Sequence, residues 1–111
     1  MLRPYQAALR RYLKKGASAS LLPAMKLGRQ AVAFGLETLD LALIHEQSMM
    51  AQMKAPGTAA ARSRMVLRSR KFFAEAIVAM EESELVREAL GDQVFEWFLR
   101  NKRAEWMSYH T

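Results

Sequence analysis

The sequence lacks cysteine and contains few residues that interrupt helices, with three prolines and five glycines in 111 residues. Without a thiol the chain can form neither a disulfide framework nor a thiolate metal site. No apolar run approaches the roughly 20 residues that span a bilayer, and the basic start is not followed by the apolar segment of a secretory signal. We therefore expect a cytoplasmic protein that makes no contact with a membrane.

The residues that are present favour helices throughout. Hydrophobic residues make up 51% of the chain, which indicates a folded protein. Helix formers such as Leu, Ala, Met, Glu, Lys and Arg dominate, and no stretch alternates apolar and polar residues with the period of a strand. The predicted fold class is all-α, a bundle of four main helices in residues 1–82 followed by a C-terminal helical extension in residues 83–111.

The spacing of apolar residues and breakers places the helices. A first helix covers Pro4 to Lys15, and its buried stripe is predicted to be Tyr5, Leu9 and Tyr12. A helical hairpin covers Ser20 to Met53 with a tight turn at Gly35. A Pro-Gly breaker then precedes Thr58, which we expect to cap a long helix ending near Glu82. In this long helix the main buried stripe is predicted to be Val66, Phe73, Ile77 and Met80, with Phe72, Ala76 and Ala79 beside it.

A short helix ending at Gly91 and a final amphipathic helix are expected to follow. We expect the final helix to pack on the bundle, because its apolar stripe would otherwise be exposed. This stripe comprises Val94, Phe95, Phe98, Leu99 and Trp106.

The net charge of +6 is unevenly distributed along the chain. Every charged side chain before Glu37 is basic, as is every one from Lys54 to Lys71, whereas acidic residues dominate from Glu75 to Glu96. Such segregation favours docking on an oppositely charged surface. The basic stretches are interrupted by apolar residues and carry no nucleic-acid-binding motif, so a solvated surface is favoured, and a small basic nucleic-acid-binding protein stays open as an alternative.

No residue pattern indicates catalysis. His45-Glu46 begins an HExxH zinc motif, but Met49 occupies the position of the second histidine. The chain has no glycine-rich phosphate loop and no spacing typical of a catalytic triad. We expect no enzyme activity, no metal and no cofactor, and we place His45 on a helix surface or against a partner.

Methionines gather where the hairpin ends, and this cluster either fills the core or forms an adaptable surface for a partner. With nearby charges it predicts a partner-binding site at Glu46, Met49, Met50, Met53, Arg62 and Arg64. The hairpin and the long helix have apolar residues on more than one face, which indicates a homodimer. The predicted dimer interface comprises Leu39, Leu43, Phe73 and Ile77.

The order of these patterns resembles a known family. The relevant residues are Tyr5, Leu9, Tyr12 and Leu13, then Ser20 to Leu22, Lys26 to Ala31, Leu39 and Leu41, Ile44 to Glu46, and Phe72 to Ala76. From about Tyr5 to Met80 they resemble the N-terminal regulatory domain of the stress-response phosphatase RsbU. The resemblance implies a non-catalytic helical bundle that dimerises and recruits a protein partner, a switch kinase or an anti-sigma-type regulator, in the partner-switching control of sigma factors.

Residues 81–111 resemble a second family, the extreme C-terminus of glutamine synthetase. The matching residues are Ser83, Glu84, Leu85, Leu90, Gly91, Val94, Phe95, Asn101, Lys102, Glu105 and Trp106. This resemblance implies no catalysis, because the nucleotide, metal and glutamate sites of that enzyme lie in other parts of its chain. It keeps open the alternative of a glutamine synthetase fragment or mimic that docks through the tail.

Overall fold

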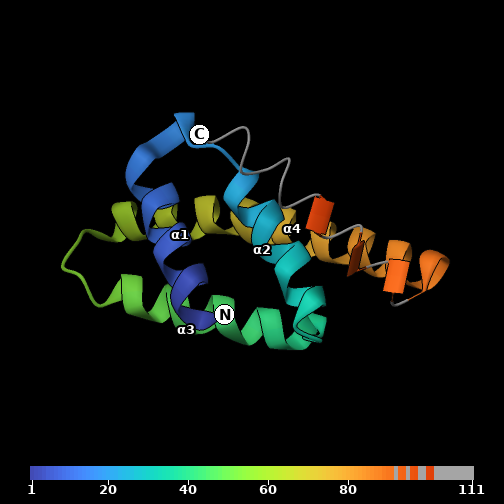
Figure 1. Ribbon diagram of the computed structural model, residues 1–111. Helices are drawn as coiled ribbons and strands as arrows, with labels where there is room; N and C mark the ends of the chain where they lie inside the picture. The colour runs from blue at the N-terminus through green and yellow to red at the C-terminus, as the bar shows by residue number, and fades with distance from the viewer. Residues whose placement is uncertain (92, 95, 98–99, 102–111) are drawn as a thin grey trace.

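The computed structural model describes residues 1–91, 93–94, 96–97 and 100–101, and over these residues the chain is helical (Figure 1). Its helices are α1 (Leu2–Lys15), α2 (Leu22–Ala33), α3 (Thr38–Met53) and α4 (Ala59–Leu90), with a 3-10 turn, η1 (Gly16–Ser18), after α1. The described positions after residue 92 are also helical, and no described residue lies in a strand. The predicted all-α bundle is confirmed. No helix of the described part combines the length and the apolar character needed to cross a bilayer.

Local capping residues set the ends of the helices. The Thr58 side chain accepts a hydrogen bond from the backbone N–H of Ala61 (3.1 Å), which confirms the predicted cap of the long helix. At the start of α3, the backbone N–H of Glu37 donates to the carboxylate of Asp40 (2.8 Å) in a capping box. This box starts α3 at Thr38, so the link from Ala33 is longer than the tight turn predicted at Gly35.

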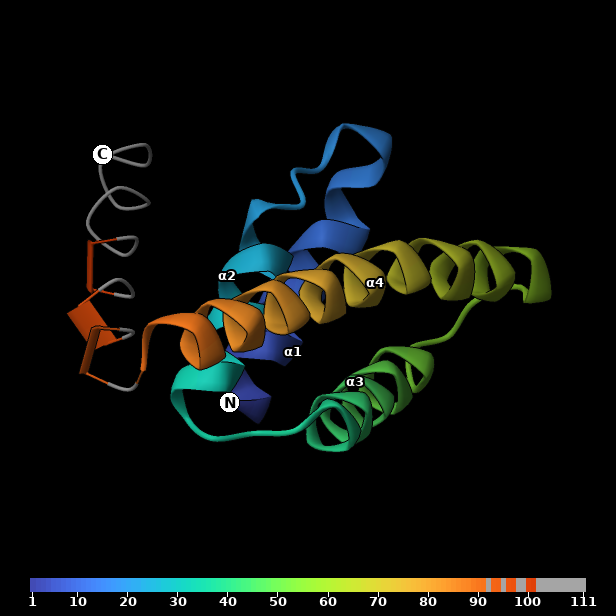
Figure 2. The same cartoon turned by 90° about the vertical axis from the view of Figure 1, so that its right-hand side faces the viewer.

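The predicted break in the long helix near Glu82 is wrong. One helix of 32 residues runs from Ala59 to Leu90, because Glu81 to Ser83 include no breaker and Ser83 is buried against the bundle. The helix ends only at Gly91, whose φ of 81° suits glycine. At 1.5 Å per residue α4 is about 48 Å long, close to the 49 Å of the longest dimension of the molecule (Figure 2).

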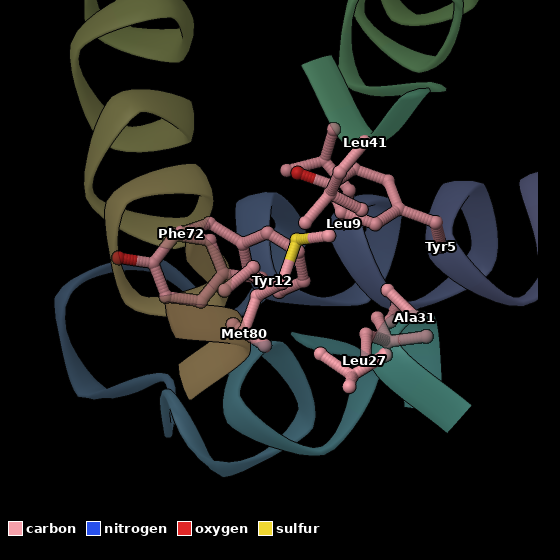
Figure 3. Packing of buried hydrophobic residues seen from close by; sticks show 12 residues of the cluster. Tyr5, Leu9, Tyr12, Leu27, Ala31, Leu41, Phe72 and Met80 are labelled. Atoms are coloured by element: carbon pink, nitrogen blue, oxygen red, sulfur yellow. The ribbon is translucent and has the colours of Figure 1, made fainter. Parts of the chain in front are cut away.

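The core lies where all four helices meet (Figure 3). The predicted stripe of α1, Tyr5, Leu9 and Tyr12, is confirmed as buried. On α4 the buried residues centre on Phe72 and Ala76, whereas Phe73 and Ile77 are half-buried beside the core. The buried stripe is therefore rotated by about one residue from the predicted one. The remaining buried apolar residues are Ala8, Ala24, Leu27, Ala31, Val32, Leu41, Ala79 and Met80.

Helices α2 and α4 touch through their backbones at Gly28. A methyl group at this position would overlap the carbonyl oxygen of Ala76 and would lie 3.0 Å from both its carbonyl carbon and the nitrogen of Met80. These are backbone atoms that no side-chain rotation can move away. Glycine is therefore what allows α2 to lie against α4 at this distance.

An arginine of α4 caps the C-terminal end of α1. The guanidinium of Arg68 donates to the carbonyls of Tyr12 (3.3 Å), Leu13 (3.4 Å) and Gly16, and it lies over the Tyr12 ring at 5.2 Å. Carbonyls at a helix C-terminus have no partner within the helix and attract a cation. One basic residue of the long helix is thus structural.

Helix α3 is held to the bundle by a hydrogen bond between two aromatic side chains. The Tyr5 hydroxyl and Nδ1 of His45 are hydrogen-bonded (2.7 Å), and the Tyr5 ring packs edge-on against Phe72. The other side of the His45 ring contacts Phe73, with centroids 4.7 Å apart. Burial lowers the pKa of His45 and raises that of Tyr5, so burial favours the neutral form of both side chains. His45, which we expected on a helix surface or against a partner, is half-buried and makes its hydrogen bond within the chain.

We predict that Gly28→Ala lowers the free energy of unfolding by about 3 kcal/mol, because α2 must move away from α4. Urea unfolding followed by circular dichroism measures this change. Gly57→Ala is the matched control: nothing lies within 4 Å of the added methyl group, so we expect no loss of stability. Equal effects of the two substitutions would show that the close approach of α2 and α4 does not contribute to stability.

We also predict that the protein becomes less stable as the pH falls below about 6.5, the pKa of an unfolded histidine. The pKa of His45 is lower in the folded state, so acid favours the unfolded chain, and the stability present above that pH is lost on acidification. His45→Asn keeps a hydrogen-bonding group for Tyr5 but cannot titrate. Between about pH 7.5 and pH 5.5 the melting temperature of this variant should fall less than that of the wild type. An equal fall in the two proteins would assign the effect to other titratable groups.

Candidate functional site

Helix α3 carries large apolar side chains on the side that faces away from the bundle. Leu39 is 70% exposed, Leu43 is 48% exposed and Met50 is 60% exposed. Because these positions are spaced by four and seven residues, they share one side of the helix, and exposed Glu46 lies among them. We call Leu39, Leu43, Glu46 and Met50 the outer face of α3.

The opposite side of α3 makes the contacts that fix the outer face in place. Leu41 is fully buried, and the hydroxyl of buried Ser48 donates to the carbonyl of Ile44 (2.8 Å). His45 lies on this inner side and bonds to Tyr5. Inner contacts therefore use only part of the apolar surface of α3 and leave the outer face pointing to solvent. Surface stripes of this kind are typical of protein-binding sites.

The residues predicted to bind a partner are distributed over several surfaces. Glu46 and Met50 belong to the outer face of α3, and Met53 is half-buried at its C-terminal end. Met49 packs against the core cluster, as its position beside Ser48 requires. The methionine cluster thus divides between core and surface.

Two arginines complete the predicted partner site, and both lie in the first turns of α4. Successive helical residues are rotated by about 100°, so Arg62 and Arg64 lie on nearly opposite sides of α4. Only one of them can therefore contact a partner that is bound to a single side of that helix. Their position near the start of α4 does not by itself place either arginine beside the methionines.

The residues predicted to form the dimer interface also differ in exposure. Leu39 and Leu43 are exposed on α3, whereas Phe73 and Ile77 are half-buried on α4 and pack against the core. Of the four, the two leucines offer most surface to another protein.

Most of the apolar stripe that we predicted for the final helix lies outside the described residues, namely Phe95, Phe98, Leu99 and Trp106. Its described member, Val94, is 47% exposed.

Reasoning from the sequence assigned Leu39 and Leu43 to one surface and Met50 to another, although all three share the outer face of α3. It also missed the hydrogen bond from Tyr5 to His45. The spacing of Leu41, His45 and Ser48 was the available signal, because these residues lie on one side of a helix. Leu39, Leu43 and Met50 also share one side of the helix and are more apolar, so the pattern favours burial of the side that the structure leaves exposed.

The outer face of α3 offers apolar contacts. Nowhere in the described part of the chain do three or more His, Asp or Glu side chains gather closely enough to hold a metal ion. The titratable groups with shifted pKa values, Tyr5 and His45, are bonded to each other between α1 and α3. Their shifts follow from burial in the core.

Comparison with curated proteins finds a short similarity to glutamine synthetase. The chain is 61% identical over 36 residues to the enzyme of Mycolicibacterium smegmatis (strain ATCC 700084 / mc(2)155). It is 64% identical over 36 residues to those of Mycobacterium bovis and Mycobacterium tuberculosis. Each match covers 32% of this chain and 8% of the relative, in its C-terminal region. The chain therefore spans a small fraction of the curated relatives it matches.

A family model accounts for most of the remaining chain. Residues 3–81 match the family described as "Phosphoserine phosphatase RsbU, N-terminal domain". Together the two similarities span more residues than the chain contains, so they overlap, and residue 81 lies inside α4. No solved structure matches the chain. Since the family model covers α1 to α3 and most of α4, the chain belongs to the family of N-terminal domains of the phosphoserine phosphatase RsbU.

Proposed function

We propose that this chain is a non-catalytic regulatory module that recruits a protein partner through the outer face of α3. The family is that of an N-terminal domain of a phosphatase, which supports a regulatory role. We further propose that the partner is a switch kinase or an anti-sigma-type regulator, and that recruitment serves partner switching in stress signalling. The observation that carries the proposal is the exposure of Leu39, Leu43 and Met50 on one side of α3.

The chemistry of this face favours a protein over other ligands. Apolar side chains at successive turns fit a helix or a sheet edge that presents an apolar stripe. Met50 adds a flexible side chain that can adapt to its partner. Glu46 lies in the middle of the stripe and can fix the register by pairing with a basic residue of the partner.

We predict that Leu39→Asp combined with Met50→Asp weakens partner capture at least tenfold. Loss of two apolar contacts at the centre of an interface commonly costs about 2 kcal/mol or more. The full chain would serve as bait in an extract of its native cells, with bound proteins quantified by mass spectrometry. Both side chains are exposed, so the circular dichroism spectrum should not change.

Gln47→Asp is the matched control, because Gln47 is exposed on α3 to one side of the outer face. It adds the same kind of charge and should leave capture unchanged. Capture of a kinase or an anti-sigma component that depends on Leu39 and Met50 would support the proposal. Capture that is equal with the wild-type and the doubly substituted bait would contradict it.

A second candidate function rests on the identity of 61–64% with glutamine synthetases over 36 residues. A segment so similar to part of an enzyme subunit can compete for the contacts which that part makes in the enzyme. On this hypothesis the chain docks on glutamine synthetase. The same experiment distinguishes the two functions, since glutamine synthetase subunits would be captured equally by both baits.

A further inference from the structure

Basic side chains gather where the C-terminal end of α1 meets α4. The two helices are joined there by Arg68, which donates to backbone carbonyls of α1. Arg64 and Lys71 lie one turn before and one turn after Arg68, so they share its side of α4. On α1 the contact falls in the last turn, which contains Lys14 and Lys15. All of these residues except Arg68 are exposed, and we call Lys14, Lys15, Arg64 and Lys71 the basic patch.

The charges of the basic patch are not neutralised within the described part of the chain. Among the described residues, none of the four side chains forms an ion pair or a hydrogen bond. No acidic residue precedes Glu37 in the sequence, and the first acidic residue of α4, Glu75, lies beyond Lys71. Cations that are held close together repel each other and attract an anionic surface.

Capping of α1 does not account for its two terminal lysines. The last carbonyls of a helix attract a cation, but at this end of α1 the guanidinium of Arg68 already bonds to three carbonyls. Packing does not account for Lys14 and Lys15 either, because both side chains are exposed. The patch therefore carries more positive charge than the fold uses.

A large apolar side chain lies between the two cations of α4. Leu67 comes three residues after Arg64 and four before Lys71, which places it on the same side of the helix. Its side chain is 61% exposed. This surface thus combines several positive charges with an apolar contact, and a ligand that fits it offers both negative charge and an apolar side chain.

This combination favours a protein over a nucleic acid. Proteins that hold single-stranded nucleic acids stack the bases on exposed aromatic rings. None of the residues of the patch is aromatic, and the Tyr12 ring at this contact is buried beneath Arg68. An acidic amphipathic helix, in contrast, presents carboxylates and aliphatic side chains on one surface.

We propose that the basic patch and Leu67 together dock an acidic amphipathic helix of a partner protein. An apolar side chain of that helix packs on Leu67, and its carboxylates pair with the cations of the patch. Arg64 and Lys71 are two turns apart, about 10 Å along α4, and acidic residues two turns apart on the partner match this spacing. The charges guide the approach of the partner and set its register. This surface is separate from the outer face of α3, and the proposal does not depend on what binds there.

A synthetic peptide tests the chemistry of the occupant. The probe is a fluorescein-labelled helical peptide of about 18 residues, or five turns, with glutamates on both sides of a leucine stripe. Its control carries glutamine in place of every glutamate. In fluorescence anisotropy at physiological salt, the acidic peptide should bind the full chain about tenfold more tightly than the control, because several ion pairs form. Equal affinities of the two peptides would overturn the proposal.

Charge reversal tests the location of the site. Lys15→Glu and Lys71→Glu should each weaken binding of the acidic peptide about fivefold, because an attractive pair becomes repulsive. Arg3→Glu is the matched control: Arg3 is exposed on the same helix as Lys15 but lies about 18 Å from it. This separation exceeds the Debye length of about 8 Å, so binding should not change. An equal loss in all three variants would show that the peptide responds only to net charge, and the proposed site would be wrong.

A neutral substitution tests the apolar contact. Leu67→Gln should weaken binding of the acidic peptide about tenfold, because an apolar side chain near the centre of the interface is lost. Val78→Gln is the matched control, since Val78 is 47% exposed on the same helix but lies about 16 Å further along. Equal affinities of the Leu67→Gln variant and the wild type would contradict an apolar contact at Leu67.

Other occupants would be revealed by the same assay. A short duplex DNA or RNA that binds more tightly than the acidic peptide, with an affinity that Leu67→Gln does not change, would make nucleic acid the occupant and overturn the proposal. Loss of peptide binding in Leu39→Asp/Met50→Asp would place the peptide on the outer face of α3. This double variant should instead bind the peptide as the wild type does, so that a failure of recruitment through α3 and a failure of docking at the basic patch can be told apart.

Discussion

The close approach of α2 to α4 at Gly28 is the constraint on which the rest of the bundle depends. A side chain at position 28 would overlap the backbone of Ala76. Because residue 28 is glycine, the two helices touch directly. This contact fixes the line along which α4 crosses the bundle and hence which of its residues are buried. Phe72 then reaches Tyr5 and Tyr12 of α1, and Arg68 reaches the last carbonyls of α1. The orientation of α1 thus follows from that of α4.

Helix α3 has fewer buried residues than the other helices, and its contacts with the bundle are polar as well as apolar. Leu41 enters the core, and His45 shares a hydrogen bond with a tyrosine that is itself buried. A buried hydroxyl without a partner costs free energy, so this bond favours one rotation of α3 over others. That rotation turns Leu39, Leu43 and Met50 outward. The orientation of the candidate binding surface therefore follows from the hydrogen bond that buried Tyr5 needs in the core.

The long helix runs without a break from the region that matches the RsbU family into the region that is similar to glutamine synthetase. The family match ends at residue 81, inside α4, and the helix continues to Leu90. The change of charge along α4 falls near the same place, between Lys71 and Glu81. A helix needs only local continuity of good helix formers to extend, so neither the change of family nor the change of charge interrupts it. The result is a long helix whose basic half and acidic half have complementary charges.

The fold class, the capped start of α4 at Thr58 and the buried stripe of α1 could be predicted from the sequence, because each depends on local spacing or on one capping residue. The sequence did not determine which side of α3 or α4 is buried. Leu39 and Leu41 are equally apolar, as are Phe72 and Phe73, and periodicity does not distinguish two apolar sides of one helix. Which side is buried depends on contacts between residues far apart in the sequence, Gly28 with Ala76 and Tyr5 with His45, and these contacts exist only in the folded chain.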